Sequence, residues 1–453
     1  MSEPNLNPTL LPDEQIGRLE TAVDRARTQS DTARLIQALI HLAQAHLDSG
    51  NVPKALTQYE EALTLAQSVK DELLEARLWG YKGMCLMRLG NSHFAQIALY
   101  KSYNMAKALD HAPLLIDALT QLGNLHVEMG QETKAISRWE QAYGIALSAG
   151  DHMRAMSLAG KIGAVFAGLA SPEKALEYYA AARQLAQKVG QQSAECLYLL
   201  QMGGVLLTSD EPDAARELLE SALNLATDLN NPQAEMNALS SLMRLYMVED
   251  KASMVTLYGE QVIRMARQVG DTAVEIGNIN LLAAYLVEKG QARRALPHLQ
   301  RGLALVEESE DWPWQMTILN QLGYAHYDLG DLDTALAAYE GALKRARQLQ
   351  DKAASGQVYG RLSAVLADKG QPLEAITAAQ QALALGQELG DNRLIGEQQI
   401  MLAFAYRDLG DVAQAAAYCR QAIEIFRQED ETQLLSNAEA LLLEIGLVTG
   451  AER

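Results

Sequence analysis

The stretch Leu319–Asp351, LNQLGYAHYDLGDLDTALAAYEGALKRARQLQD, brings glycine, tyrosine, histidine and aspartate close together. It is therefore either a chemical site or one copy of a structural unit. The same kinds of residue return forty positions away in both directions. Steps of forty from Gly330 reach, without insertion or deletion, a series of marks: Gly50, Gly90, Gly130, Ala170, Asp210, Asp250, Gly290, Gly330, Gly370, Gly410 and Gly450. The stretch is one copy of a repeated unit.

Three further positions keep a fixed distance from each mark. The residue five after is alanine in every unit except the one with Val255. The residue seven before is mostly small: Ala43, Gly83, Gly123, Gly163, Gly203, Met243, Ala283, Gly323, Ser363 and Ala403. The residue nine after is mostly large: Tyr59, Leu99, Trp139, Tyr179, Leu219, Gly259, Leu299, Tyr339, Ala379 and Cys419. This alternation predicts two helices per unit that interlock along one seam.

Apolar residues between the marks recur at intervals of three and four, as in Leu319, Leu322, Ala325 and Leu329, which is the helical period. A second break halfway along each unit often reads Gly-Asp, and these residues suit a helix end and the cap of the next helix. The cap spacing predicts ten pairs of helices of about 17 residues between residues 31 and 430. One further helix is expected at about 12 to 29 and another at about 432 to 447.

Length, composition and charge narrow the class of protein. A chain of 453 residues exceeds the usual size of one compact core, and its low aromatic content of 6% favours helix. The start of the sequence has no export signal and no stretch of 18 apolar residues follows, so we expect a soluble, cytoplasmic protein that does not enter a membrane. The three cysteines are too far apart for a metal motif and are expected to be reduced and buried. A net charge of -19 argues against nucleic acid as a partner.

Two stretches carry the resemblance to a known family. They are Leu122-Gly123-Asn124 with Gly130, Ala135, Trp139 and Ala142, and Leu322-Gly323-Tyr324 with Gly330, Ala335, Tyr339 and Ala342. This pattern resembles the tetratricopeptide repeat (TPR), in a form of forty residues instead of the usual 34. The long form is similar to Pins-type adaptors, kinesin light chains and bacterial TPR sensor arrays. The resemblance implies an all-α, right-handed superhelical TPR solenoid of ten helix-turn-helix repeats with flanking cap helices. The implied division is a tail and capping helix at 1–30, ten units at 31–430, and a capping helix and tail at 431–453.

The histidines are the main test for an enzyme. His46, His126 and His326 all lie four residues before a mark, where three other units have Phe166, Tyr246 and Tyr406, so they hold a structural position. His46 and His126 are two repeats apart, several helix diameters of about 8 to 10 Å, which is too far to share one metal ion. No metal-protease, phosphate-loop or nucleophile-elbow motif occurs. We expect no enzymatic activity, no metal site and no cofactor.

The resemblance also implies which residues face a concave groove, namely those ten and six positions before each mark. Of these, only Arg244 is charged, and the basic clamp of the chaperone-binding members is absent. The most polar continuous stretch of the groove, formed by Arg244, Asn280, Asn320 and Tyr324, is expected to bind an extended peptide with one acidic residue. Asn124 is a further candidate for peptide binding. Trp312 falls at a polar position of its unit and is a candidate surface anchor, with packing onto the neighbouring loop as the alternative.

Three function classes follow. The first is a non-catalytic scaffold that binds a peptide or helix of a partner protein in its groove. The second is a regulatory array that senses a small molecule, for which Gly160, Ala164 and Gly204 beside Leu197 and Leu200 would leave an apolar pocket. The third is a structural protein that assembles with itself. We favour the first.

Overall fold

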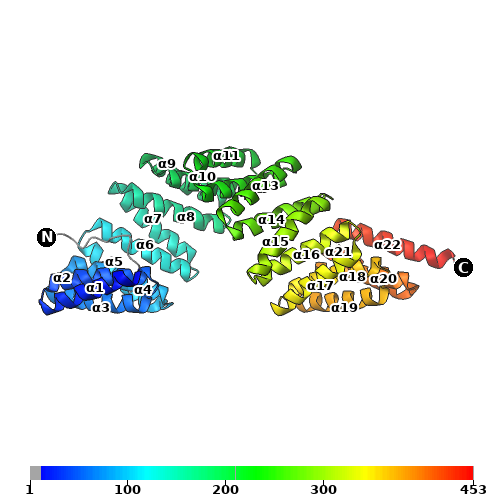
Figure 1. Ribbon diagram of the computed structural model, residues 1–453, viewed down its shortest axis with the longest axis horizontal. Helices are drawn as coiled ribbons and strands as arrows, with labels where there is room; N and C mark the ends of the chain where they lie inside the picture. Colours follow the sequence, from blue (N-terminus) through cyan, green and yellow to red (C-terminus); the bar gives the residue numbers. More distant parts are fainter. Residues whose placement is uncertain (1–11, 210, 452–453) are drawn as a thin grey trace. The chain divides into compact units, whose positions relative to one another are not determined.

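The computed structural model describes residues 12–209 and 211–451, and its regular structure there is entirely α-helical (Figure 1). The helices in chain order are α1 (Pro12–Thr28), α2 (Thr32–Asp48), α3 (Val52–Val69), α4 (Glu72–Arg88), α5 (Ser92–Ala108), α6 (Ala112–Glu128), α7 (Glu132–Ser148), α8 (His152–Gly168), α9 (Pro172–Lys188), α10 (Gln192–Thr208), α11 (Pro212–Asp228), α12 (Pro232–Val248), α13 (Ala252–Val269), α14 (Thr272–Glu288), α15 (Ala292–Glu308), α16 (Trp312–Asp328), α17 (Leu332–Gln348), α18 (Lys352–Asp368), α19 (Pro372–Leu389), α20 (Asn392–Asp408), α21 (Val412–Gln428) and α22 (Thr432–Ala451). The ten predicted pairs are α2 with α3 through α20 with α21.

The chain forms two compact units, residues 1–241 and 242–453, and the boundary falls within α12. Within each unit, helices that follow one another in the sequence pack together. The first helix of one pair can also contact the first helix of the next pair. In the first unit α4 contacts α6, and in the second unit α14 contacts α16 and α18 contacts α20. Each repeat therefore builds its core with its neighbours, which is the packing of a solenoid.

The marks adopt the left-handed backbone conformation wherever the structure describes them from Gly50 to Gly410. Seven are glycines, and the other two are Ala170 with φ 51° and Asp250 with φ 54°. Asp210 lies outside the described residues. Glycine reaches this conformation without steric cost, which explains why it is common at the marks. The predicted turns are therefore present, and the helices between them have 17 or 18 residues.

The breaks halfway along the units are helix caps, as the sequence predicts. The side chains of five aspartates each accept a hydrogen bond from the backbone N–H three residues further on: Asp151, Asp271, Asp311, Asp351 and Asp391. Such caps satisfy amide groups that the first turn of a helix leaves unpaired.

The predicted seam of large and small residues is confirmed by the space around the glycines. A Cβ atom added to Gly123 would lie 2.2 Å from Nε1 of Trp139, and one added to Gly323 would lie 2.6 Å from the Tyr339 ring. The large residue thus fills the notch that the missing side chain leaves. In the sixth pair the sizes are exchanged, because the first helix has the large Met243 and the second helix has the small Gly259. A Cβ atom added to Gly259 would lie 2.8 Å from the Met243 sulfur.

Three other sequence expectations can be compared with the structure. Cys85, Cys196 and Cys419 are free and buried, as expected. Helix α22 continues to Ala451, so Gly450 does not end a helix as the other marks do. The space beside Gly160, expected to belong to a ligand pocket, is instead filled by Tyr198, whose hydroxyl would lie 2.7 Å from an added Cβ.

Candidate functional site

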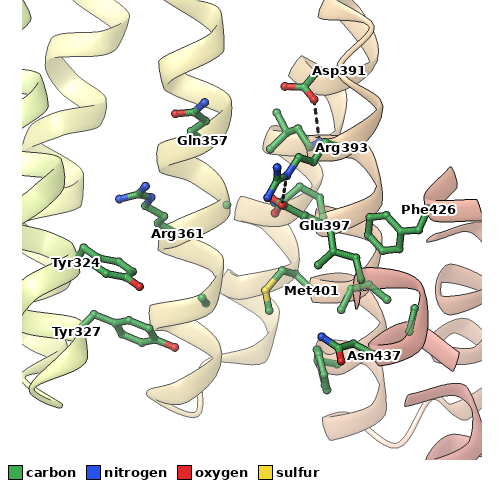
Figure 2. Close-up of a pocket in the computed structure, with 18 of the residues that line it drawn as sticks. Tyr324, Tyr327, Gln357, Arg361, Asp391, Arg393, Glu397, Met401, Phe426 and Asn437 are labelled. Atoms are coloured by element: carbon green, nitrogen blue, oxygen red, sulfur yellow. Dashed lines mark hydrogen bonds and ion pairs between the residues drawn. The ribbon is translucent and has the colours of Figure 1, made fainter. Parts of the chain in front are cut away.

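The second unit contains a pocket of about 800 Å³, which we call the C-terminal pocket. It is formed by first helices α16, α18 and α20 and closed by residues of α21 and α22 (Figure 2). Figure 2 shows Tyr324 and Tyr327 on one side of the space and Phe426 and Asn437 on the other. Its wall is mixed, since apolar side chains such as Met401 alternate with amides and guanidinium groups.

The lining follows the repeat. It takes the residues 13, 10, 9 and 6 positions before a mark: Gln357, Gly360, Arg361 and Ala364 in α18, and Glu397, Ile400, Met401 and Phe404 in α20. These spacings of three, four and seven place all four positions on one side of a helix. We call this side the first-helix face.

The same four positions line a smaller pocket of about 300 Å³ in the first unit. Its lining includes Arg77, Gly80, Tyr81 and Met84 of α4 and Asp117, Thr120 and Gln121 of α6. Both units therefore present hollows on the first-helix face. The sequence analysis used only the positions ten and six before each mark, so it missed Arg361 and Glu397. Helical periodicity applied to the same repeat would have included them.

Arg361 is the distinctive charge of the C-terminal pocket. Its guanidinium carbon lies 5.5 Å from the centre of the Tyr324 ring, which is a cation–π distance. Within the described residues Arg361 has no ion pair with a carboxylate. Burial raises the pKa of the neighbouring Tyr339 to about 12, and Arg361 acts against that rise by favouring the phenolate.

The other charged groups of the pocket are paired. Nε of Arg393 lies 3.1 Å from Oε1 of Glu397, and its Nη1 lies 3.8 Å from Oε1 of Glu431. Asp391 accepts a hydrogen bond of 3.0 Å from the backbone N–H of Leu394 as the cap of α20. Among the arginines that line the pocket, Arg361 is therefore the one without a carboxylate partner within the described residues.

Tyr327 completes the α16 side of the pocket. Its hydroxyl donates a hydrogen bond of 2.6 Å to Oδ2 of Asp368. Burial, followed by this bond to a carboxylate, raises the pKa of Tyr327. The tyrosine therefore stays protonated and holds α16 to the end of α18.

Gln398 contributes a buried amide to the wall. Its side chain is 4% exposed, and its Oε1 is buried without a hydrogen-bond partner. The Nε2 end lies against Gly360, since an added Cβ there would be 2.6 Å away. The first unit has the corresponding pair Gly160 and Tyr198, where the tyrosine hydroxyl donates to the Met156 carbonyl at 3.2 Å. Buried amides are usually satisfied, and the oxygens of Gln398, Asn278, Gln321 and Gln399 are among the exceptions within the described residues. Of these four, the Gln398 side chain is the one that lines the C-terminal pocket.

The residues predicted to bind a peptide lie in different surroundings. Tyr324 is 44% exposed and lines the C-terminal pocket. Oδ1 of Asn280 accepts a hydrogen bond of 2.8 Å from Gln321, which joins α14 to α16. Oδ1 of Asn320 on α16 is buried and has no partner. These three residues therefore lie on adjacent first helices of the second unit.

Arg244, Asn124 and Trp312 do not line the C-terminal pocket. Arg244 is exposed on α12. Asn124 belongs to the first unit, where Nζ of Lys161 donates to its Oδ1 at 3.3 Å. Trp312 is 40% exposed at the start of α16, and the guanidinium carbon of Arg345 lies 5.7 Å from its ring centre. The expected exposure of Trp312 is present, and its visible contact is with a side chain of α17.

The described residues show no arrangement typical of a metal site. Within them, no group of three or more histidine, cysteine or acidic residues is placed to hold a metal ion. His46 and His126 are 3% and 2% exposed, and burial lowers the pKa of both, so their neutral forms are favoured. No helix in the described ranges meets the length and hydropathy of a membrane span.

Comparison with known families agrees with the repeat found in the sequence. Models described as tetratricopeptide repeat match residues 154–228, 275–348 and 354–428, and another with the same description matches 40–92. A model for anaphase-promoting complex subunit 5 matches residues 86–159. The chain belongs to the tetratricopeptide-repeat family. No sequence among curated proteins matches it.

Solved structures share the fold. The apo form of RapI is 12% identical, with a TM-score of 0.57 over 79% of this chain and 98% of that chain. A signal transduction ATPase with numerous domains from Pyrococcus horikoshii, which carries a tetratricopeptide repeat sensor, is 10% identical, with a TM-score of 0.56 over 80% of this chain and 55% of that chain. At these identities the likeness shows an all-α TPR solenoid.

Proposed function

We propose that the chain is a non-catalytic scaffold that binds an extended segment of a partner protein on the first-helix face of residues 242–453. The observation that carries the proposal is the C-terminal pocket, whose lining repeats the same four positions on successive first helices. A repeated face of this kind offers similar contacts at regular intervals, which suits an extended chain. In this proposal α1 and α22 cap the array of ten pairs.

Polar groups next to the pocket suit a peptide backbone. An asparagine amide can donate to and accept from one peptide unit, and Asn320 has an oxygen without a partner. Tyr324 adds an exposed aromatic ring of the kind that often dominates binding energy. The polar stretch expected from the sequence is therefore proposed to begin at Asn280 and Asn320 and to continue into the pocket. Arg244 would contact the same segment further along.

A regulatory array that senses a small molecule is the second candidate. The volume of the C-terminal pocket, about 800 Å³, falls within the range of about 300 to 1,000 Å³ common for ligand sites. A metabolite that raises the unfolding temperature of the purified chain would favour this candidate. A self-assembling structural protein, the third class, would leave the pocket without a specific ligand.

The proposal can be tested with peptides selected from a random phage-displayed library against the purified chain. Affinity for the best peptide is measured by fluorescence anisotropy. Tyr324→Ala combined with Asn320→Ala should weaken binding by about 2 to 4 kcal/mol, since an aromatic contact and an amide are both lost. Leu373→Ala is the matched control, because Leu373 is 67% exposed on the second helix α19. Unchanged affinity in the double variant would move the site elsewhere.

A second pair of variants tests how far the segment extends. Arg244→Ala combined with Asn320→Ala removes the charge and the amide that the sequence analysis placed in the groove. If binding survives both pairs, Trp312→Ala is the next surface variant to measure. Circular dichroism of each variant checks that the helices are retained.

A further inference from the structure

We propose that the C-terminal pocket selects an acidic residue of the bound segment, with Arg361 as the group that holds its carboxylate and Gln398 as the group that pairs with the adjoining peptide unit. This inference rests on the proposed function and adds the chemistry of the partner. It moves the anchoring charge from Arg244, which the sequence alone suggested, to a residue inside a pocket.

Charge is the first argument. The chain carries a net charge of -19, yet within the described residues Arg361 makes no ion pair with a carboxylate. At the same pocket Arg393 is bound to Glu397 and Asp391 caps a helix. A carboxylate that enters the pocket therefore meets one cation that is not already neutralised. Arginine binds carboxylates through two parallel hydrogen bonds, which gives direction as well as attraction.

Preorganisation is the second argument. The Tyr324 ring centre lies 5.5 Å from the Arg361 guanidinium carbon, and a hydrogen bond with Tyr339 also holds the guanidinium. Because a guanidinium has five N–H donors, donors remain for a ligand. Arg361 is half-buried, so less side-chain entropy is lost when a ligand binds than for a free surface arginine. Tyr324 thus serves both to position Arg361 and to contact the segment.

Gln398 supplies the third and independent argument. It lies on the next first helix, packed against Gly360, the residue directly before Arg361. Its buried oxygen has no hydrogen-bond partner, and unlike the equally unpaired oxygen of the neighbouring Gln399 it belongs to a side chain that lines the pocket. A rotation of the terminal amide would present this oxygen to a peptide N–H. A peptide unit offers both a donor and an acceptor, whereas a free carboxylate offers acceptors alone.

The remaining wall indicates what stands next to the acid. Ile400, Met401 and Phe404 of α20 are half-buried, and Leu434 of α22 closes the space. Apolar side chains of this kind would bury an aliphatic or aromatic residue of the segment. The partner is therefore an extended peptide in which aspartate or glutamate is followed or preceded closely by an apolar residue. A small dicarboxylic acid would use Arg361 and leave this apolar surface uncovered.

The test uses the full-length chain and the peptide selected above. The selected peptides should share an acidic residue beside an apolar one. Changing that residue from aspartate to asparagine, or glutamate to glutamine, should weaken binding to the unchanged protein on the order of 10- to 100-fold. Arg361→Gln should weaken binding of the acidic peptide by a similar factor, and should not weaken the amide peptide further. Arg293→Gln, the same change at an exposed arginine of the second helix α15, is the matched control and should leave binding unchanged.

Each contrary result has a distinct meaning. Peptides that need Tyr324 but lack an acidic residue, or that bind Arg361→Gln normally, overturn the inference and leave the proposed function in place. Peptides that do not need Tyr324, or the selection of none, overturn the proposed function and the inference with it. Micromolar binding of succinate that is lost in Arg361→Gln would show that the ligand is a free acid and not a peptide. The peptide substitutions need no variant protein, so a poorly folding variant does not weaken the test.

Discussion

Ala170 occupies a left-handed turn position that glycine fills at seven other marks. A side chain in this conformation costs about 1 to 2 kcal/mol, because Cβ approaches the following carbonyl oxygen. The residue is exposed, so its methyl group contributes little packing in return. The turn between α8 and α9 is therefore held by the packing of its two helices against the local preference of the backbone.

We expect Ala170→Gly to stabilise this turn by about 0.5 to 1 kcal/mol. Glycine removes the steric cost of the left-handed conformation, and part of that gain is lost because glycine is more flexible in the unfolded chain. Native-state hydrogen exchange of amides in α8 and α9 measures the change locally. Ala167→Gly is the control, because Ala167 is exposed but helical, and there glycine should destabilise by up to about 1 kcal/mol. A loss of stability in Ala170→Gly would contradict this explanation of the mark.

His46 gives a prediction about pH. Burial lowers its pKa below the ordinary value of 6.5, so the unfolded chain binds this proton more readily than the folded one. Stability from the neutral imidazole is therefore complete above pH 6.5 and is lost as the pH falls below that value. The phenylalanine at the same position of another unit, Phe166, has no titratable group.

The variant His46→Phe should unfold with a weaker dependence on pH than the wild type between pH 7.5 and 5.5. The difference should appear as a smaller loss of protection at low pH for amides of α2 and α3. Hydrogen exchange corrected for the intrinsic pH dependence gives the measurement. The same slope in both proteins would show that His46 remains neutral in the unfolded chain or finds a partner when protonated.

Among the elements, the sixth pair of helices, α12 and α13, departs most from the repeat. Its seam is reversed, with Met243 in the space beside Gly259. Asp250 stands where glycine is usual, but Lys289 lies 2.6 Å from its carboxylate and the Tyr285 hydroxyl donates to it at 3.0 Å. These contacts of Met243 and Asp250 offset part of the stability that the irregular residues of this pair cost.

We still expect this pair to be the least protected, because Gly259 lowers helix stability by about 1 kcal/mol relative to alanine. Amide exchange should be faster over residues 232–268 than over 111–150 or 311–350, the third and eighth pairs. Uniform protection over the three ranges would mean that the contacts of Met243 and Asp250 compensate in full.

The reversed seam also predicts coupling between its two residues. Gly259→Leu alone should destabilise by about 1 to 3 kcal/mol, because the new side chain would overlap Met243 and Leu282. Met243→Gly in the same chain would restore the usual order of sizes and should recover much of that loss. Urea unfolding of the four proteins of this double-mutant cycle measures the coupling. Additive effects would show that the two residues do not share one space.

At the scale of the whole molecule, the sequence was sufficient for the helices and their turns. The helical period, the helix caps and the left-handed turn positions each depend on residues that are close together in the sequence. The forty-residue spacing repeats all three without interruption. It was insufficient for the end of α22, which was expected at about residue 447 but lies at Ala451. It was also insufficient for Gly160, because the residue that fills its space, Tyr198, comes from the next repeat.

The candidate site was predicted in part for the same reason. Tyr324 was chosen from its place in the repeat and lines the pocket. Arg361 was missed because only two of the four positions on the first-helix face were considered. The unpaired oxygen of Gln398 could not be recognised from sequence, since it depends on which groups the folded chain fails to bring near it.

The central claim is that an extended peptide binds on the first-helix face of the second unit. Photo-crosslinking tests it most directly, with a selected peptide that carries a photoreactive phenylalanine analogue and mass spectrometry of the crosslinked sites. The account predicts crosslinks to Tyr324, Met401 and Phe404, which are lost when unlabelled peptide is added in excess. Crosslinks to the second helices instead, for example at Leu373 of α19, would contradict it.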